Sequence, residues 1–189
     1  HYPVRRGELL NLVVIVEGPA PEDLTQWDHA ANALQLARAL QGSCAALRDV
    51  VGSVEASGGQ WRLWPLSDRA PLTGPQCMAR GLVGLIGDAA HPMRPYLAQG
   101  AGMAIEEAAG LQRALAMADL DVSTRLRRYA LNRWQRNARV QARSIRNGEI
   151  FHATGLMRWG RDSALRLLGS RLMDVPWLYR GDGACATGW

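Results

Sequence analysis

Residues 82–111, LVGLIGDAAHPMRPYLAQGAGMAIEEAAGL, decide the fold because they read as a strand, a tight loop and a helix in succession. The apolar run at residues 82–86 is long enough for one buried strand, and the turn-forming pair Gly87-Asp88 ends it. Two prolines then keep the chain out of a helix and remove two backbone donors. This stretch therefore predicts a strand that leads through a stiff loop into a helix.

The helix is expected to follow the glycines Gly100 and Gly102, with its start within residues 100–103. Gly100 and Gly102 let a backbone approach another object closely, and Glu106 and Glu107 place negative charge in the early turns, where it suits the helix dipole. The small apolar face expected on this helix consists of Ala104, Ala108, Leu111, Leu115 and Ala118, which recur at helical spacing.

The loop and the helix start offer a specific binding chemistry. A helix N-terminus preceded by glycines has unpaired N–H groups and partial positive charge, which stabilise negative charge that develops on a bound ring carbonyl. Asp88, at the strand end, can accept a hydrogen bond from a sugar hydroxyl. These features suit the two ends of one extended nucleotide cofactor.

The segment GDAAHPMRPYLAQGAGMAIEEA, residues 87–108, resembles the second FAD-binding motif of the single-component aromatic-ring hydroxylases. The subgroup that it most resembles contains the salicylate hydroxylases and the 6-hydroxynicotinate 3-monooxygenases. The motif is long and specific, and the likeness extends weakly on both sides, from Tyr2 to about His152.

The resemblance implies a set of cofactor-binding residues. In that family the aspartate holds the ribityl or ribose part of FAD, and the Gln-Gly-Ala-Gly segment lies with the following helix against the pyrimidine edge of the flavin. The residues expected to bind FAD are Gly87, Asp88, Pro95, Gln99, Gly100, Ala101, Gly102 and Met103. No residue is assigned a catalytic role, and no metal ligand is expected.

The resemblance also implies substrate contacts at Tyr2, Pro95 and Tyr96. The proline lies beside the reactive face of the flavin, and the next residue borders the substrate, so the Tyr96 hydroxyl could donate to a carboxylate or phenolate. Tyr2, in the substrate-domain sheet, is either a second contact or an ordinary strand aromatic. Arg94 either attracts an aromatic acid or points to solvent, and solvent is favoured because arginine is mostly exposed.

The expected function follows from the same resemblance. The parent enzyme is expected to be a FAD-dependent monooxygenase that hydroxylates a small aromatic acid with NADH or NADPH and O2. The family's G-x-G-x-x-G fingerprint is absent from this sequence, so the chain is expected to be a C-terminal half that is inactive without the missing N-terminal half. Two alternatives stay open: a non-catalytic truncated domain, and a flavin dehydrogenase or quinone-precursor hydroxylase of the same superfamily.

Composition limits the class of protein. No run approaches the ~20 apolar residues that span a membrane, and there is no signal peptide at the start. Cys44, Cys77 and Cys185 have no metal or redox spacing, which fits a reducing cytoplasm. None of the four histidines has metal-ligand spacing either. We expect a cytoplasmic protein with no membrane partner, and a homodimer is left open.

The formal net charge of +5 raises nucleic-acid binding as an alternative. Much of the excess lies on one helix, where Arg133, Arg136, Arg139, Arg143 and Arg146 are three or four residues apart. The favoured interpretation is a solvated face, or one that pairs with carboxylates of the missing half, so no nucleic-acid partner is expected. His91 could relay a proton, but a structural hydrogen bond is favoured.

The fold class expected is mixed α/β (α+β). Residues 1–75 should form part of an antiparallel substrate-domain sheet, residues 76–180 the C-terminal part of a FAD-binding domain with a helical arm, and residues 181–189 a mobile tail. Strands are expected at residues 1–5, 8–17 and 60–66, the first two as a hairpin, and further helices at residues 25–40, 44–51, 123–152 and 163–173. Ser123 should cap the longest helix, whose apolar stripe comprises Leu126, Ala130, Trp134 and Ala138.

Overall fold

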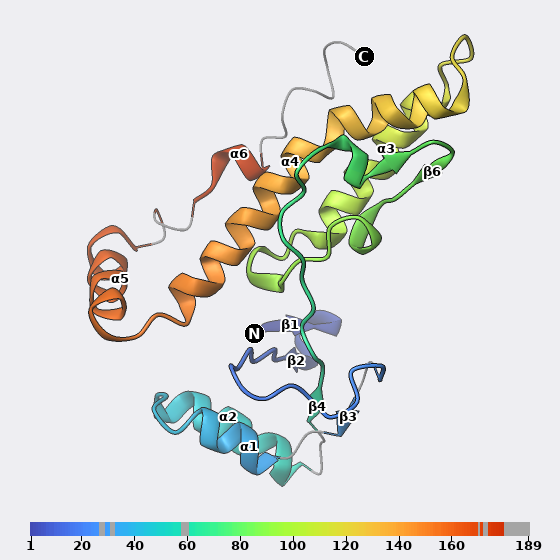
Figure 1. Cartoon of the computed structure of the whole chain (residues 1–189). Helices are drawn as coiled ribbons and strands as arrows, with labels where there is room; N and C mark the ends of the chain where they lie inside the picture. The colour runs from blue at the N-terminus through green and yellow to red at the C-terminus, as the bar shows by residue number, and fades with distance from the viewer. Residues whose placement is uncertain (27–28, 31–32, 58–60, 170, 172–173, 180–189) are drawn as a thin grey trace. The chain divides into compact units, whose positions relative to one another are not determined.

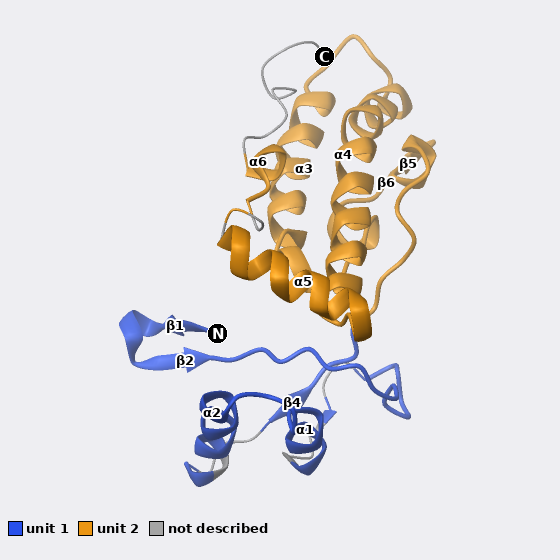
Figure 2. Ribbon diagram, turned by 90° about the vertical axis from the view of Figure 1, so that its left-hand side faces the viewer, with its two compact units in different colours: residues 1–66 blue, residues 67–189 orange. Residues whose placement is uncertain are grey.

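The computed structural model describes residues 1–26, 29–30, 33–57, 61–169, 171 and 174–179. It divides into two compact units, His1–Leu66 and Ser67–Trp189 (Figures 1 and 2). This division lies slightly earlier than the expected boundary near Pro75, and the assignment of a substrate domain and a FAD-binding domain stays a prediction. The expected tail at residues 181–189 lies outside the described residues.

The first unit begins with an antiparallel hairpin, as expected. Strands β1 (Tyr2–Val4) and β2 (Leu9–Asn11) pair with Tyr2 opposite Asn11, and the turn η1 (Arg5–Gly7) joins them. The strand expected at residues 8–17 is wrong in its length. Only its first part has a partner among the described strands, and an extended backbone becomes a regular strand only where its N–H and C=O groups are paired.

The remainder of the first unit combines two helices with a second small sheet. Strand β3 (His29–Ala30) pairs antiparallel with β4 (Arg62–Leu63), and helices α1 (Ala33–Ala39) and α2 (Ala45–Ala56) lie between them in sequence. The helix expected at residues 25–40 is therefore wrong in its first part, where strand pairing overrides helical propensity. Helix α2 is longer than the expected helix at residues 44–51.

The second unit is built on two long helices, α3 (Gly100–Leu115) and α4 (Val122–Phe151), which lie side by side and antiparallel (Figure 2). Arg125 closes their connection, because its guanidinium donates to the main-chain carbonyls of Leu115, Ala118 and Leu120 at 3.0, 2.9 and 2.6 Å. Three carbonyls at the end of α3 and in the connection thereby obtain a donor that the helix itself does not supply.

Helix α4 begins one residue before the expected start and is capped differently. The side chain of Asp121 accepts from the Thr124 amide at 3.0 Å, so the expectation that Ser123 caps the helix is wrong. Aspartate is as good a cap as serine, and the backbone of Asp121 is extended as a cap requires. Of the expected apolar stripe, Leu126 and Ala130 are buried, and the other two members are half-buried against the same core.

The buried face of α3 differs from the expected face. Met103, Glu107, Gly110 and Ala114 are buried, whereas Ala108, Leu115 and Ala118 are exposed. The row of buried residues is shifted by about one position from the apolar row that the sequence predicted. As a result, the Glu107 carboxylate points inward. Helical spacing alone predicted the wrong buried face for α3, because the groups that donate hydrogen bonds to Glu107 come from other elements.

A short hairpin precedes the functional loops. Strands β5 (Ala79–Arg80) and β6 (Val83–Gly84) pair antiparallel, after the single turn η2 (Pro75–Cys77). The expectation of a buried strand at residues 82–86 is wrong for this chain, because the Leu82 and Val83 side chains are 76% and 62% exposed. Within the described part of the chain, β6 has only β5 as a strand neighbour, so it is not an inner strand of a larger sheet.

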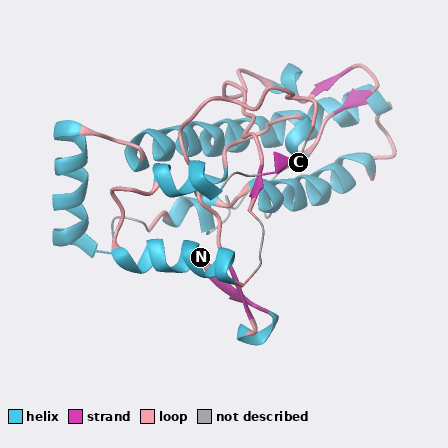
Figure 3. Ribbon diagram, turned by 90° about the horizontal axis from the view of Figure 1, so that it is seen from below, coloured by secondary structure: helices cyan, strands magenta, loops and turns pink. Residues whose placement is uncertain are grey.

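Two helices follow α4. Helix α5 (Gly155–Leu168) begins and ends earlier than the helix expected at residues 163–173, and α6 (Pro176–Tyr179) is a single turn (Figure 1). Leu178 of α6 packs with Met103 and Val140, so this turn covers part of the core between α3 and α4. Figure 3 shows how helices and loops dominate the molecule and how short the strands are.

Candidate functional site

The turn η3 (Gly87–Ala89) follows β6 and carries the first predicted cofactor residues. Gly87 has a φ of 57°, in the left-handed region that side chains rarely adopt. A Cβ there would also lie 3.4 Å from the Cβ of Ala104. Glycine at this position therefore lets the turn pack closely against the first turns of α3. The amides of Ala90 and His91 both donate to the Gly87 carbonyl and close the turn.

Asp88 lies beside the start of α3. A Cβ added to Gly100 would lie 3.8 Å from Asp88 Oδ1. The Asp88 carboxylate is exposed and has no partner among the described side chains. The structure therefore brings together the carboxylate and the helix start that the sequence predicts as two ends of one site.

The first turn of α3 keeps amide groups available. Gln99, the N-cap residue, has helical φ and ψ, and its side chain makes no capping hydrogen bond. The first amides of a helix have no acceptor within the helix, so they can donate to a bound group. A Cβ on Gly102 would meet the Gln99 side-chain oxygen at 3.4 Å. Ala101 is exposed, whereas the Met103 side chain is buried in the core, so only the main chain of Met103 can contribute.

The predicted substrate residues Pro95 and Tyr96 lie in the turn η4 (Pro95–Leu97), against the C-terminal end of α4. The Tyr96 hydroxyl lies 2.8 Å from His152 Nε2, and its ring meets the rings of Phe151 and His152 edge-on, with centroids 5.9 and 5.7 Å away. Gly148 makes room for the ring, because a Cβ there would lie 2.7 Å from Tyr96 Cε2. No pattern in the sequence predicted the contact between Tyr96 and His152.

Arg94 and Tyr2 are the two other candidates from the sequence. Arg94 forms an ion pair with Asp68 at 2.6 Å, and both side chains are partly exposed, in keeping with the favoured solvent-facing interpretation. Tyr2 belongs to the first unit, where it is exposed in β1. Its role as a substrate contact stays a prediction.

A fully buried polar cluster lies behind the Gly87 turn, and sequence reasoning missed it. Glu107 Oε2 accepts from the Gly87 amide at 2.7 Å, and Oε1 lies 2.6 Å from His91 Nε2. Asn137 of α4 also donates to Oε1 from its side-chain amide. All three side chains of this Glu107 cluster are buried. His91 therefore makes the structural hydrogen bond that was favoured over a proton relay.

The neighbouring Glu106 links α3 to α4 instead. Its carboxylate accepts from Arg133 at 2.6 Å and from Arg136 at 2.7 and 2.8 Å, and both arginines are buried. Burial by itself raises the pKa of Glu106, but the hydrogen bonds and charges of Arg136 and Arg133 outweigh it and hold the pKa below its usual value. Two of the five arginines thus pair with a carboxylate of this chain, which for these two corrects the expectation of a solvated face or of partners in a missing half. Arg139 stacks over the Trp177 ring at 3.9 Å.

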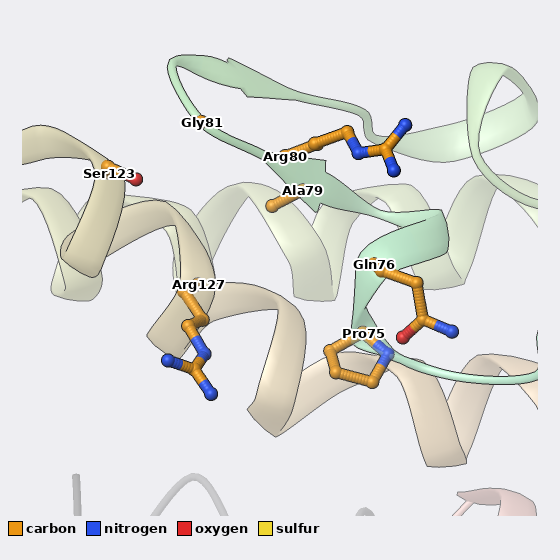
Figure 4. A pocket seen from close by; sticks show the side chains of 7 residues that line it. All are labelled: Pro75, Gln76, Ala79, Arg80, Gly81, Ser123 and Arg127. Atoms are coloured by element: carbon orange, nitrogen blue, oxygen red, sulfur yellow. The ribbon is translucent and has the colours of Figure 1, made fainter.

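A separate hollow of about 250 Å³ lies between the β5–β6 hairpin and the start of α4 (Figure 4). Its lining residues are Pro75, Gln76, Ala79, Arg80, Gly81, Ser123 and Arg127, none of which is a predicted site residue. Figure 4 shows that the guanidinium groups of Arg80 and Arg127 point away from each other. They therefore do not converge on one bound anion.

Among the described residues, no helix is both long and apolar enough to cross a lipid bilayer. Nor do three or more potential metal-binding side chains gather at any point in the described ranges.

Comparison with known proteins places these features in a wider context. Residues 55–144 match the family model described as "FAD binding domain". A 3-hydroxybenzoate 6-hydroxylase of Polaromonas naphthalenivorans is 34% identical over 95% of this chain and 43% of its own length. A 6-hydroxynicotinate 3-monooxygenase of Bordetella bronchiseptica is 37% identical over 61% of this chain and 30% of its own length.

Among solved structures, a salicylate hydroxylase in a substrate complex aligns with a TM-score of 0.72 and 27% identity, over 96% of this chain and 44% of that one. This likeness confirms the mixed fold class. The chain spans less than half the length of each of these relatives.

Proposed function

We propose that this chain belongs to the FAD-binding aromatic-ring hydroxylases, because residues 55–144 match the FAD-binding-domain model and the relatives named above are hydroxylases of aromatic acids. The whole protein is then a FAD-dependent monooxygenase. Its substrate is a small aromatic acid, which it hydroxylates with NADH or NADPH and O2. The names of its relatives support this substrate class, because they act on hydroxybenzoate, hydroxynicotinate or salicylate. The chain is the part of that enzyme that contains the second cofactor motif.

The arrangement of Asp88 and the start of α3 carries the proposal. The exposed carboxylate can accept from a ribityl or ribose hydroxyl, while the first amides of α3 can donate to the oxygen-bearing edge of the flavin ring. Gly100 and Gly102 leave room for a close approach of that ring. When bound, FAD supplies the oxygen-transfer chemistry, and the residues of this chain bind it and orient it.

The full set proposed to bind FAD consists of Gly87, Asp88, Pro95, Gln99, Gly100, Ala101, Gly102 and Met103. Gly87 contributes through the shape of its turn, and Met103 through its main chain, because its side chain is buried. These residues fit the cofactor because they combine one exposed carboxylate with uncapped amides and no bulky side chain at the first and third positions of α3.

The proposed substrate side comprises Pro95 and Tyr96, with Tyr2 as a further contact. Pro95 fixes the turn just before the helix start, and Tyr96 is held in place by Gly148 and by its hydroxyl contact with His152.

The remaining proposals concern the whole protein. An N-terminal segment with the dinucleotide fingerprint would bind the FAD pyrophosphate, and the protein would act in the cytoplasm, as a monomer or a homodimer. A flavin dehydrogenase or a quinone-precursor hydroxylase would differ in its products. Incorporation of labelled O2 into an aromatic acid distinguishes the proposed reaction from both.

The test of the site is Asp88→Ala in the full-length protein, with the FAD dissociation constant as the readout. Loss of a charge-assisted hydrogen bond costs about 1.5–3 kcal/mol, so the constant should rise roughly ten- to a hundredfold. Asp119→Ala, at an exposed position in the α3–α4 connection, is the matched control and should leave it unchanged. An unchanged constant for Asp88→Ala would remove this carboxylate from the cofactor site.

A further inference from the structure

We propose that Glu107 is a positioning residue of the cofactor site: it clamps the turn of residues 87–91 at both ends and so fixes the direction of the Asp88 carboxylate. This inference rests on the proposed function, because it assigns the task of Asp88 to FAD binding. Glu107 itself is fully buried and does not touch the cofactor.

The clamp consists of two contacts from one carboxylate. Oε2 of Glu107 accepts from the Gly87 amide, where the turn begins, and Oε1 accepts from His91 Nε2, where the turn ends. Asp88 lies between these two anchor points. The carboxylate proposed to accept from the cofactor's sugar hydroxyl is therefore carried by a short loop that is fixed on either side of it.

A carboxylate is the side chain that this position requires. Three donors converge on its two oxygens: the Gly87 amide, the His91 ring and the Asn137 side-chain amide. An ionised carboxylate only accepts hydrogen bonds and can satisfy all three, and a buried charge persists only where such donors surround it. A glutamine would direct its own NH2 group at one or more of these donors.

The direction of Asp88 depends on this clamp. Asp88 has no side-chain partner in the described part of the chain, so only the backbone of the turn orients it. Its carboxylate must lie beside Gly100, on the helix that also carries Glu107. Through the clamp, α3 sets the distance between its own first amides and the carboxylate that binds the far end of the cofactor.

Glu106 provides a matched control for any variant of Glu107. It is the preceding residue of the same helix, it is also a carboxylate held by hydrogen bonds, and it too joins α3 to α4. It makes no contact with the turn of residues 87–91. A variant of Glu106 therefore weakens the packing of the same helices without releasing Asp88.

The experiment measures FAD dissociation constants and thermal unfolding of the full-length protein for Glu107→Gln and Glu106→Gln, with titrations well below both unfolding transitions. We expect both variants to unfold at lower temperature. Glu107→Gln should weaken FAD binding about tenfold or more, and Glu106→Gln by no more than about twofold. Equal weakening by both variants would show a general loosening of the helices and would overturn the proposal.

A double-mutant cycle tests whether Glu107 acts through Asp88. In an Asp88→Ala background the clamp has nothing to position, so adding Glu107→Gln should change the FAD dissociation constant by less than about twofold. Independent, multiplicative effects would overturn the proposal. If Asp88→Ala alone leaves the constant unchanged, the assignment of the cofactor site itself has failed, which separates the two failures.

His91→Leu supplies a second route if Glu107→Gln does not fold. It removes the ring donor at one end of the clamp and keeps the carboxylate and its bond to the Gly87 amide. We expect FAD binding to weaken by at least about threefold, together with faster hydrogen exchange at the Gly87 amide. Unchanged FAD affinity in this variant would overturn the proposal.

Discussion

The variant Gly148→Ala tests whether the Tyr96 ring packs closely against α4. In a helix interior with free space around it, glycine to alanine stabilises a protein by about 1 kcal/mol. At Gly148 the new Cβ would lie 2.7 Å from Cε2, 3.1 Å from Cδ2 and 3.2 Å from Cζ of Tyr96. Carbon atoms in contact prefer a separation of about 3.5–4.0 Å, so the ring must move by roughly 1 Å.

That movement has a cost, because the Tyr96 ring has few directions in which to go. It lies edge-on to Phe151 and His152, and its hydroxyl is 2.8 Å from His152 Nε2. Overpacking of this kind costs about 1–3 kcal/mol. After subtraction of the helical gain, Gly148→Ala should lower the free energy of unfolding by about 0–2 kcal/mol.

Gly160→Ala is the control, because Gly160 lies in α5 and a Cβ there would meet no atom within 4 Å. It should raise the free energy of unfolding by up to about 1 kcal/mol. Urea unfolding of the two variants beside the parent protein measures both values. If Gly148→Ala proves as stabilising as Gly160→Ala, the close contact between Tyr96 and α4 does not exist in solution.

Three further predictions concern the same unit. Tyr96→Phe should raise KM for the aromatic acid or uncouple NAD(P)H oxidation from hydroxylation while flavin content stays normal, and unaffected coupling and KM would leave the hydroxyl with a packing role only. Gly100→Val should lower flavin content, since its side chain would enter the space next to Asp88 Oδ1, and normal flavin content with normal turnover would contradict the close approach of the ring. Glu106→Gln should destabilise the protein at pH 7 by about 1–2 kcal/mol, a value reduced because the carboxylate is about one-third exposed. Because the pKa of Glu106 is lowered in the folded state, its contribution is present above the unfolded pKa of about 4.3 and is lost as pH falls through the folded value; a difference in stability that persists unchanged at pH 2–3 would refute the ion pair.

Sequence patterns predicted the parts of the fold that depend on local preference. Glycines and prolines placed the start of α3 correctly, and α4 has nearly its expected length. The hairpin at the start of the chain also formed where a turn-type sequence separates two extended runs. In each case the deciding interactions lie within a few residues of one another.

The errors occurred where partners distant in sequence decide the outcome. Glu107 was expected to place negative charge near the helix start, but it lies buried in the core, where Gly87, His91 and Asn137 hydrogen-bond to it. Glu106 likewise meets arginines that are 27 and 30 residues away. A prediction from helical periodicity places every carboxylate on the outer face. The buried face predicted for α3 was therefore wrong by about one position.

Arg125 has a consequence for the order in which the second unit folds. By binding three carbonyls at and just beyond the end of α3, it ties both helices together across a connection of a few residues, and contacts between neighbours in sequence are the quickest to form. The bond between Asn137 and Glu107 closes a loop of 30 residues, and that between Asn137 and Met78 one of 59. Helices α3 and α4 should therefore pack together first, and the turn of residues 87–91 should pack against them afterwards. Arg125→Ala should accordingly slow refolding more than it accelerates unfolding.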